Sequence, residues 1–169
     1  MTSERRHFFA LVVLLSAVHA VLAAVVPVSG DEAYYWDCSR HLDWSYFDQP
    51  PLVIWTMIPF RALLGETALA VRAPALLASL LVALFLLPLG RRLGGSPRQA
   101  AGIWLLLHAL PLFLIGSFYT STDVAMVAAF VGATWAAVAL AQGEERGWYG
   151  FGIAMGLGFL AKFPVVLAL

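Results

Sequence analysis

Long apolar runs dominate this sequence and decide what it can fold into. A helix that crosses a bilayer needs about 20 apolar residues, and runs of that kind occupy residues 8–26, 73–90, 99–116 and 123–141, with a fifth beginning at residue 148. Only 12% of the residues are charged, whereas soluble domains carry about 25%. So few charges cannot cover a water-facing surface. We therefore predict an all-α, polytopic transmembrane helical bundle of about five spans.

The two ends of the sequence leave alternatives. The first run could be a cleaved signal peptide, because Arg5 and Arg6 precede it. The apolar cores of signal peptides are about 7–15 residues long, and residues 8–26 exceed that length, so we favour a retained span. The last run, residues 148–169, ends on apolar residues with no cap or basic flank. We interpret the chain as a truncated part of a longer protein.

The basic residues predict how the chain crosses the membrane. Lys and Arg gather in cytoplasmic loops close to the ends of spans, and here they cluster at residues 5–6 and 91–98. Both clusters are cytoplasmic only if the apolar segment 52–64 does not cross. That segment is short and contains Pro59 and Arg61, so we predict a helix lying on the outer membrane interface. The alternative is an ordinary span followed by an unusual basic outer loop.

This topology predicts one long outer loop, residues 27–72, that carries juxtamembrane helices. Within it, Ser29 followed by Asp31 and Glu32 is typical of a helix start, because Ser caps helices and acids favour the first turn. The loop is also rich in aromatic residues of the kind that anchor proteins at the membrane interface. These residues are Trp36, Trp44, Tyr46, Phe47 and Trp55.

Three charged residues are expected on the outer face: Asp31, Asp123 at the start of the fourth run, and Lys162 inside the last helix. Asp123 could instead be a helix N-cap, and Lys162 could reach outward to the lipid headgroups. An acid can take the proton from an attacking hydroxyl, and a cation can neutralise the charge that grows on a departing phosphate. Carboxylates could alternatively hold a divalent cation.

Composition gives no support to several other functions. Ten basic and ten acidic residues give a formal net charge of zero, so nothing indicates a nucleic-acid partner. The single cysteine, Cys38, cannot form an intrachain disulfide, and no set of Cys and His residues has the spacing of a zinc site. The expected partner that composition does indicate is the lipid bilayer.

Several short motifs together resemble one family of membrane enzymes. The segments 31–36 and 46–52 resemble the first outer loop of bacterial glycosyltransferases of the GT-C superfamily. The order and spacing of the motifs agree over essentially the whole chain, which is similar to the ArnT-like and protein-mannosyltransferase-like set (glycosyltransferase family 39). Further matches are Gly65-Glu66, Arg72-Ala73-Pro74, Gly90–Gly95, Thr122-Asp123 and Ala161–Pro164.

The resemblance implies transfer of a sugar from a polyprenyl-phosphate donor to a lipid, glycan or protein acceptor. It places the reaction on the extracytoplasmic face of the bacterial inner membrane. It implies catalytic roles for Asp31 and Asp123. It also implies substrate binding by Glu32, Tyr35, Asp48, Gln49 and Lys162, of which Lys162 would meet the carrier phosphate. Asp31, Asp48 and Asp123 are the candidate ligands if a divalent cation is required.

This chain departs from the family pattern at Gln49, where relatives usually carry His or Lys. An amide can donate a hydrogen bond to a phosphate but cannot neutralise its charge. Relatives also continue with further spans and often an outer soluble domain. The alternative function is a transporter or flippase for lipid-linked saccharide with Asp123 and Lys162 along its path, although transporter sites tend to lie near the bilayer midplane. A third possibility is a structural membrane subunit.

Overall fold

A computed structural model describes residues 2–164 of the chain. Over these residues the secondary structure is helical, with turns and short links between the helices, as predicted. In chain order the helices are α1 (Ser3–Val25), α2 (Gly30–Cys38), α3 (Leu52–Leu64), α4 (Ala68–Arg92), α5 (Pro97–Ala109), α6 (Pro111–Gly116), α7 (Thr122–Ala141) and α8 (Gly147–Ala161).

Three of these helices are long and apolar enough to cross a membrane, namely α1, α4 and α7. Helix α8 is apolar but has only 15 residues. The last part of the span predicted over residues 148–169 lies outside the described residues. Helix α3, with 13 residues, is the other shorter apolar helix of the described chain. The structure therefore confirms the helical class and three of the about five predicted spans by length.

The span predicted over residues 99–116 is not one continuous helix. It consists of α5 and the short α6, separated at Leu110, whose backbone is extended with φ −84° and ψ 119°. Pro111 causes the break because the residue before a proline is sterically kept out of the helical conformation. Proline itself suits the first turn of the next helix, since it has no N–H to satisfy there.

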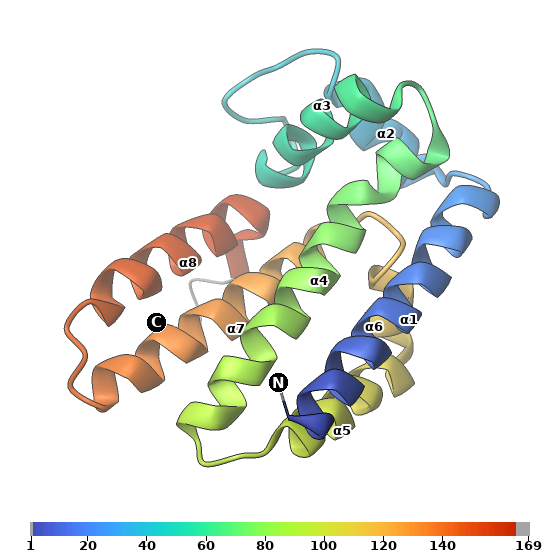
Figure 1. The fold of residues 1–169 in the computed structure, drawn as a ribbon. Helices are drawn as coiled ribbons and strands as arrows, with labels where there is room; N and C mark the ends of the chain where they lie inside the picture. The colour runs from blue at the N-terminus through green and yellow to red at the C-terminus, as the bar shows by residue number, and fades with distance from the viewer. Residues whose placement is uncertain (1, 165–169) are drawn as a thin grey trace.

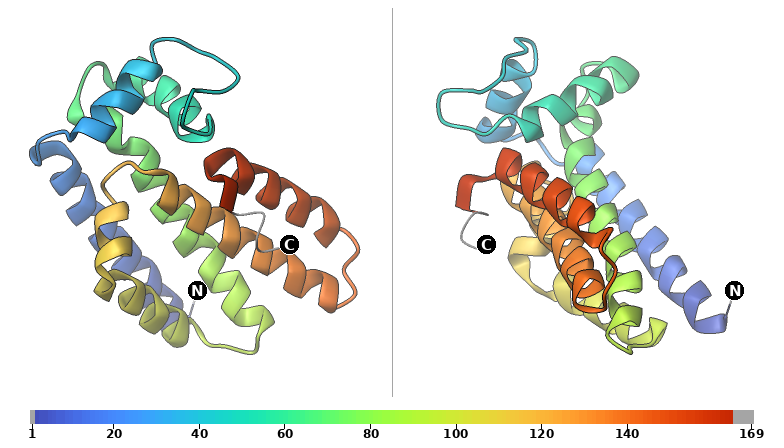
Figure 2. Two further views of the ribbon diagram at one scale, coloured as in Figure 1. Left: turned by 180° about the vertical axis from the view of Figure 1, so that it is seen from behind. Right: turned by 90° about the vertical axis from the view of Figure 1, so that its left-hand side faces the viewer.

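Helices α2 and α3 lie together at the end of the bundle where α1 ends and α4 begins (Figure 1). The start of α1 and the turn between α4 and α5 lie at the opposite end, so the two basic clusters share one end, as the charge argument requires. Helix α8 packs along α7 and returns toward the end that carries α2 and α3 (Figure 2). We call that end the outer end.

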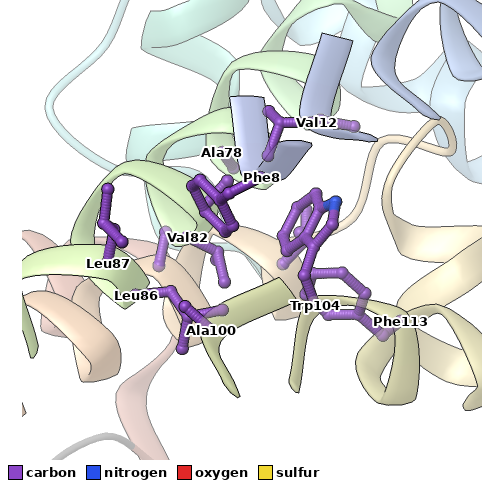
Figure 3. Packing of buried hydrophobic residues seen from close by; sticks show 13 residues of the cluster. Phe8, Val12, Ala78, Val82, Leu86, Leu87, Ala100, Trp104 and Phe113 are labelled. Carbon is purple, nitrogen blue, oxygen red and sulfur yellow. The ribbon is translucent and has the colours of Figure 1, made fainter. Parts of the chain in front are cut away.

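The main hydrophobic core joins α1, α4, α5 and α7. Phe8, Val82 and Trp104 are fully buried in it. Figure 3 shows Phe8 and Val12 of α1 meeting residues of α4 and α5. Small buried residues on the long helices, such as Ala78, let the helix backbones approach closely, as is usual for helices packed in a membrane.

A second, smaller core fixes α2 and α3 to the start of α4. It consists of Tyr35 from α2, Val71 from α4, and three residues of α3: Val53, Ile54 and Met57. The bounds of α3 match the predicted segment 52–64. This second core packs the two helices of the first outer loop, α2 and α3, against the start of α4.

Candidate functional site

The first turn of α2 presents Asp31 at the outer end. The Ser29 hydroxyl accepts a hydrogen bond from the Glu32 backbone N–H, and the Glu32 carboxylate accepts one from the Ser29 N–H (3.2 and 3.0 Å). This reciprocal capping box satisfies two N–H groups that would otherwise lack a partner. The predicted helix start is therefore confirmed. Asp31 is exposed, whereas the next residue, Glu32, is fully buried.

Glu32 forms a buried ion pair with Arg72 of α4. Arg72 Nε and Nη2 each lie 2.8 Å from a Glu32 carboxylate oxygen, and the two side chains are 1% and 0% exposed. Burial alone would raise the pKa of Glu32. Hydrogen bonds from Arg72 and from the backbones of Ser29 and Thr120 outweigh it, and they hold the pKa below its usual value. The carboxylate predicted to bind substrate is thus occupied by protein groups.

Tyr119, in the link before α7, was not among the predicted site residues. Its hydroxyl accepts a hydrogen bond from the Ser29 hydroxyl at 2.9 Å and lies 3.5 Å from Oδ2 of Asp31. The signal that could have identified it is its place in the short link between two spans that the topology puts on the outer side. Through these contacts Tyr119 connects the first outer loop to the link between α6 and α7.

Tyr35 lies where the predicted acids gather. Its pKa is raised by burial, and further by the charges of Asp31, Tyr119, Asp48 and Asp123. The three carboxylates come from α2, from the loop before α3 and from α7, so the fold brings them to the same end of the molecule.

Asp48 and Gln49 lie in the loop between α2 and α3. Asp48 is exposed and accepts a hydrogen bond of 2.6 Å from the Tyr34 hydroxyl, which raises the pKa of Tyr34. Gln49, next to it, is half-buried. The Tyr34 side chain, one turn of α2 after Asp31, therefore holds Asp48 against this helix.

Asp123 and Lys162 form an ion pair. Lys162 Nζ lies 2.5 Å from Asp123 Oδ1. Asp123 is not the N-cap of α7, because Ser121 takes that position and accepts a hydrogen bond from the Asp123 N–H. Lys162 does not lie inside a helix as predicted, since α8 ends at Ala161 and the backbone of Lys162 is extended. Pro164 explains this end, because a proline cannot continue the helical hydrogen-bond pattern.

An apolar cavity of about 430 Å³ runs between α3, α4, α7 and α8. Ser121 and Val124, which flank Asp123 in the sequence, line its outer part, while Trp135 and Gly150 line its inner part. Since a helix rises 1.5 Å per residue, the stretch of α7 from Ser121 to Trp135 is roughly 20 Å long. The cavity is therefore a groove along the spanning direction that starts beside the first turn of α7.

Metal binding by the predicted ligands has no support from the geometry of the described chain. Among residues 2–164, no group of three or more His, Cys, Asp or Glu side chains is arranged so that it could hold a metal ion. Asp31, Asp48 and Asp123 share one end of the molecule but each has a different polar partner: Tyr119, Tyr34 and Lys162.

Residues 48–169 match the family of dolichyl-phosphate-mannose-protein mannosyltransferases. The lipid A galacturonosyltransferase RgtD of Rhizobium johnstonii is 30% identical, over 80% of this chain and 29% of the relative. The undecaprenyl phosphate-alpha-4-amino-4-deoxy-L-arabinose arabinosyl transferase of Edwardsiella ictaluri is 30% identical, over 90% and 32%. The transferase of the same name from Pseudomonas aeruginosa is 29% identical, over 89% and 29%.

The chain thus spans between 29% and 32% of the length of these curated relatives. No solved structure matches it. The long apolar helices and the similarity to these transferases together indicate an integral membrane protein.

Proposed function

We propose, from the premise that the chain belongs to the dolichyl-phosphate-mannose-protein mannosyltransferase family, that the whole protein is a membrane glycosyltransferase. It moves a sugar from a polyprenyl-phosphate carrier to an acceptor on the extracytoplasmic side of the bacterial inner membrane. The activities for which the relatives are named support an undecaprenyl-phosphate donor and lipid A as the acceptor. The relatives differ in the sugar, which is galacturonic acid in one name and 4-amino-4-deoxy-L-arabinose in the other.

One observation carries this proposal: the apolar groove along α7 starts beside the Asp123–Lys162 ion pair. A polyprenyl phosphate has a long apolar chain and a single charged head, and the groove and the pair offer complementary surfaces to the two parts. We place the carrier chain in the groove, with its phosphate at Lys162. The basic clusters lie at the opposite end of the bundle, which supports an extracytoplasmic site.

The proposed reaction uses three charged side chains, Asp31, Lys162 and Asp123. The acceptor hydroxyl oxygen attacks C1 of the sugar, and the bond between C1 and the phosphate oxygen breaks with its electron pair leaving on the phosphate. Asp31, which is exposed, takes the proton of the acceptor hydroxyl. Lys162 neutralises the charge that grows on the phosphate. Asp123 holds the Lys162 ammonium group at the end of the groove until a phosphate oxygen replaces its carboxylate.

The other predicted residues take supporting roles in this proposal. Asp48 and Gln49 lie in the same outer loop and bind the sugar or the phosphate of the carrier. Tyr35 is buried in the hydrophobic core beneath the acidic residues and supports the helix that carries Asp31. Glu32 does not reach the substrate, because its carboxylate is buried against Arg72.

The experiment is sugar transfer by the full-length protein in membranes, with a labelled undecaprenyl-phosphate sugar as donor and lipid A as acceptor. Asp31→Asn should lower the rate at least about 100-fold, which is the usual contribution of acid–base catalysis. Asp123→Asn should lower it on the order of 100-fold, because the Lys162 ammonium group is then no longer held at the end of the groove. Membrane insertion should not change. Asp37→Asn, at an exposed acid of the same helix α2, is the matched control and should transfer normally.

Normal transfer by both the Asp31 and the Asp123 variants would exclude the proposed reaction. The flippase alternative predicts that the protein moves the carrier across the membrane without transferring its sugar. Labelled carrier should then cross the bilayer of proteoliposomes when no acceptor is present. It should do so in Asp31→Asn as well as in the native protein.

A further inference from the structure

Arg72 uses all of its hydrogen-bond donors at the outer end of the bundle. A guanidinium group has five N–H bonds. Two of them point to the Glu32 carboxylate, through Nε and Nη2. The other three reach backbone carbonyls at the end of α1 and just beyond it: Ala23 (3.1 Å), Val26 (2.6 Å) and Pro27 (2.7 Å). Arg72 therefore holds the last turn of α1 and the start of the outer loop against α4.

Glu32 makes a matching set of contacts as an acceptor. One carboxylate oxygen accepts from Arg72 Nε and from the Thr120 N–H at 3.2 Å, and the other accepts from Arg72 Nη2 and the Ser29 N–H. The Thr120 hydroxyl in turn donates to the carbonyl of Val71 at 2.8 Å. The pair thus joins four segments: the end of α1, the start of α2, the start of α4 and the link before α7.

The residues beside this pair in the sequence are those of the candidate site. Asp31 precedes Glu32, and Tyr119 precedes Thr120 and approaches the Asp31 carboxylate. Asp123 follows shortly after Thr120, in the first turn of α7. A buried ion pair is a poor source of stability, since apolar residues of similar volume often serve as well or better. What the pair adds is fixed geometry between the segments that carry Asp31 and Asp123.

We infer that Glu32 and Arg72 act as a positioning clamp for the proposed transfer reaction, holding Asp31 and Tyr119 at a set place relative to Asp123 and Lys162. This inference rests on the function proposed above. Neither residue of the clamp touches the donor or the acceptor. Both act through Asp31, and a misplacement of about 1 Å at a catalytic group can lower a rate about 100-fold.

The test uses the full-length protein in lipid nanodiscs with the variants Arg72→Lys and Glu32→Gln. Lysine keeps the charge but has only three donors in place of five. We expect kcat to fall on the order of 100-fold, whereas KM for the donor should change much less, because the carrier groove is untouched. Hydrogen exchange should become faster in residues 26–33 and 117–123 and stay unchanged along α8.

The matched control is Glu144→Gln. Glu144 also forms a bidentate ion pair with an arginine, Arg92, but that pair is exposed and lies at the opposite end of the bundle. This variant should change neither kcat nor the exchange of the outer segments. The inference is overturned if kcat per folded molecule is unchanged in Arg72→Lys, or if exchange rises uniformly through the chain.

A double variant separates positioning from a general loss of stability. If Glu32 acts through Asp31, the variant Asp31→Asn/Glu32→Gln should be no slower than Asp31→Asn alone. If the rate losses of the two single variants instead multiply in the double variant, the inference is overturned. If Glu32→Gln does not fold, Tyr119→Phe removes the hydroxyl beside Asp31 without leaving a buried charge, and an unchanged kcat there would also count against the clamp.

The same experiments distinguish failure of the clamp from failure of the proposed function. If Asp31→Asn and Asp123→Asn both retain normal transfer, the proposed function fails. The hydrogen-exchange comparison between Arg72→Lys and Glu144→Gln still decides whether the clamp orders the outer segments.

Discussion

Lys162 Nζ and Asp123 Oδ1 lie 2.5 Å apart, which joins the end of α8 to the first turn of α7. The two side chains are 37% and 38% exposed, so water reaches both of them. An ion pair that is open to solvent contributes little to stability and is easily exchanged for another partner. The carrier phosphate that we propose at Lys162 would therefore replace the Asp123 carboxylate without disrupting the fold.

Replacing Lys162 should weaken binding of the donor. A hydrogen bond to a charged group contributes about 1.5–3 kcal/mol, so Lys162→Met should raise KM for the polyprenyl-phosphate sugar on the order of tenfold or more. Lys162→Arg keeps the positive charge and should have a smaller effect. Donor titrations with the full-length protein measure this, and an unchanged KM in Lys162→Met would remove Lys162 from the phosphate site.

Filling the groove should weaken the binding of long-chain carriers but not of short-chain ones. Ala129 lines the groove on α7, so Ala129→Trp should fill the space in which we propose that the polyprenyl chain binds. We expect weaker binding of the full-length carrier and unchanged binding of a short-chain analogue that does not reach this depth. Thr134→Trp, at an exposed position of α7 that does not line the groove, is the control. Equal effects on both carriers would contradict the proposed path.

Breaking the buried ion pair should destabilise the protein far more than breaking an exposed one. Glu32→Gln leaves Arg72 buried without a counter-charge, and such changes cost about 3–5 kcal/mol. Glu144→Gln removes one partner of an exposed pair, and its melting temperature should stay close to that of the native protein. Thermal unfolding in nanodiscs, followed by tryptophan fluorescence, compares the two. Similar melting temperatures for both variants would contradict the burial argument.

Acid should weaken the outer end through Glu32. Its pKa in the folded protein lies below the ordinary value of 4.5, so its charged form stabilises the fold above that pH. This contribution is lost as the pH falls from about 4.5 through the lower folded-state pKa. Melting temperatures measured at a series of acidic pH values should fall more steeply for the native protein than for Glu32→Gln. Parallel curves would show that Glu32 does not titrate in this way.

The contact between α7 and α8 depends on Gly147. A Cβ atom at this position would lie 2.8 Å from Cγ of Leu140 and 2.9 Å from the Ala136 carbonyl oxygen. Gly147→Ala should therefore destabilise the protein by about 1–3 kcal/mol, as overpacking usually does. Gly152→Ala, in the same helix but with open space around the added atom, should be neutral or slightly stabilising. Unfolding measurements on both variants test the difference.

Local signals in the sequence predicted the helices of the outer loop well. Helix α3 begins after Pro51 and ends before Gly65, whose φ of 70° favours glycine, and these two residues bound the predicted segment. The start of α2 followed from the capping pattern of Ser29 and Glu32. The break at Leu110 is also encoded locally, by Pro111, although the continuous apolar run around it is typical of a single span.

Contacts between distant residues could not be predicted in the same way. The partner of Arg72 is 40 positions away, and that of Lys162 is 39 positions away. Charge alone does not say which acid pairs with which base, because pairing depends on how the helices pack. The resemblance implies substrate binding by Glu32 and no role for Arg72, whereas the structure buries the two together.

The contacts of Glu32 also imply an order of assembly during synthesis. Glu32 emerges from the ribosome 40 residues before Arg72 and 88 residues before Thr120. Until α4 is in place, the Glu32 carboxylate remains hydrated, and until the link before α7 follows, one of its oxygens still lacks the Thr120 partner. The outer end therefore closes only after the first three apolar runs and the link that follows them have been made. A nascent chain stalled before residue 120 should keep this segment open to proteases.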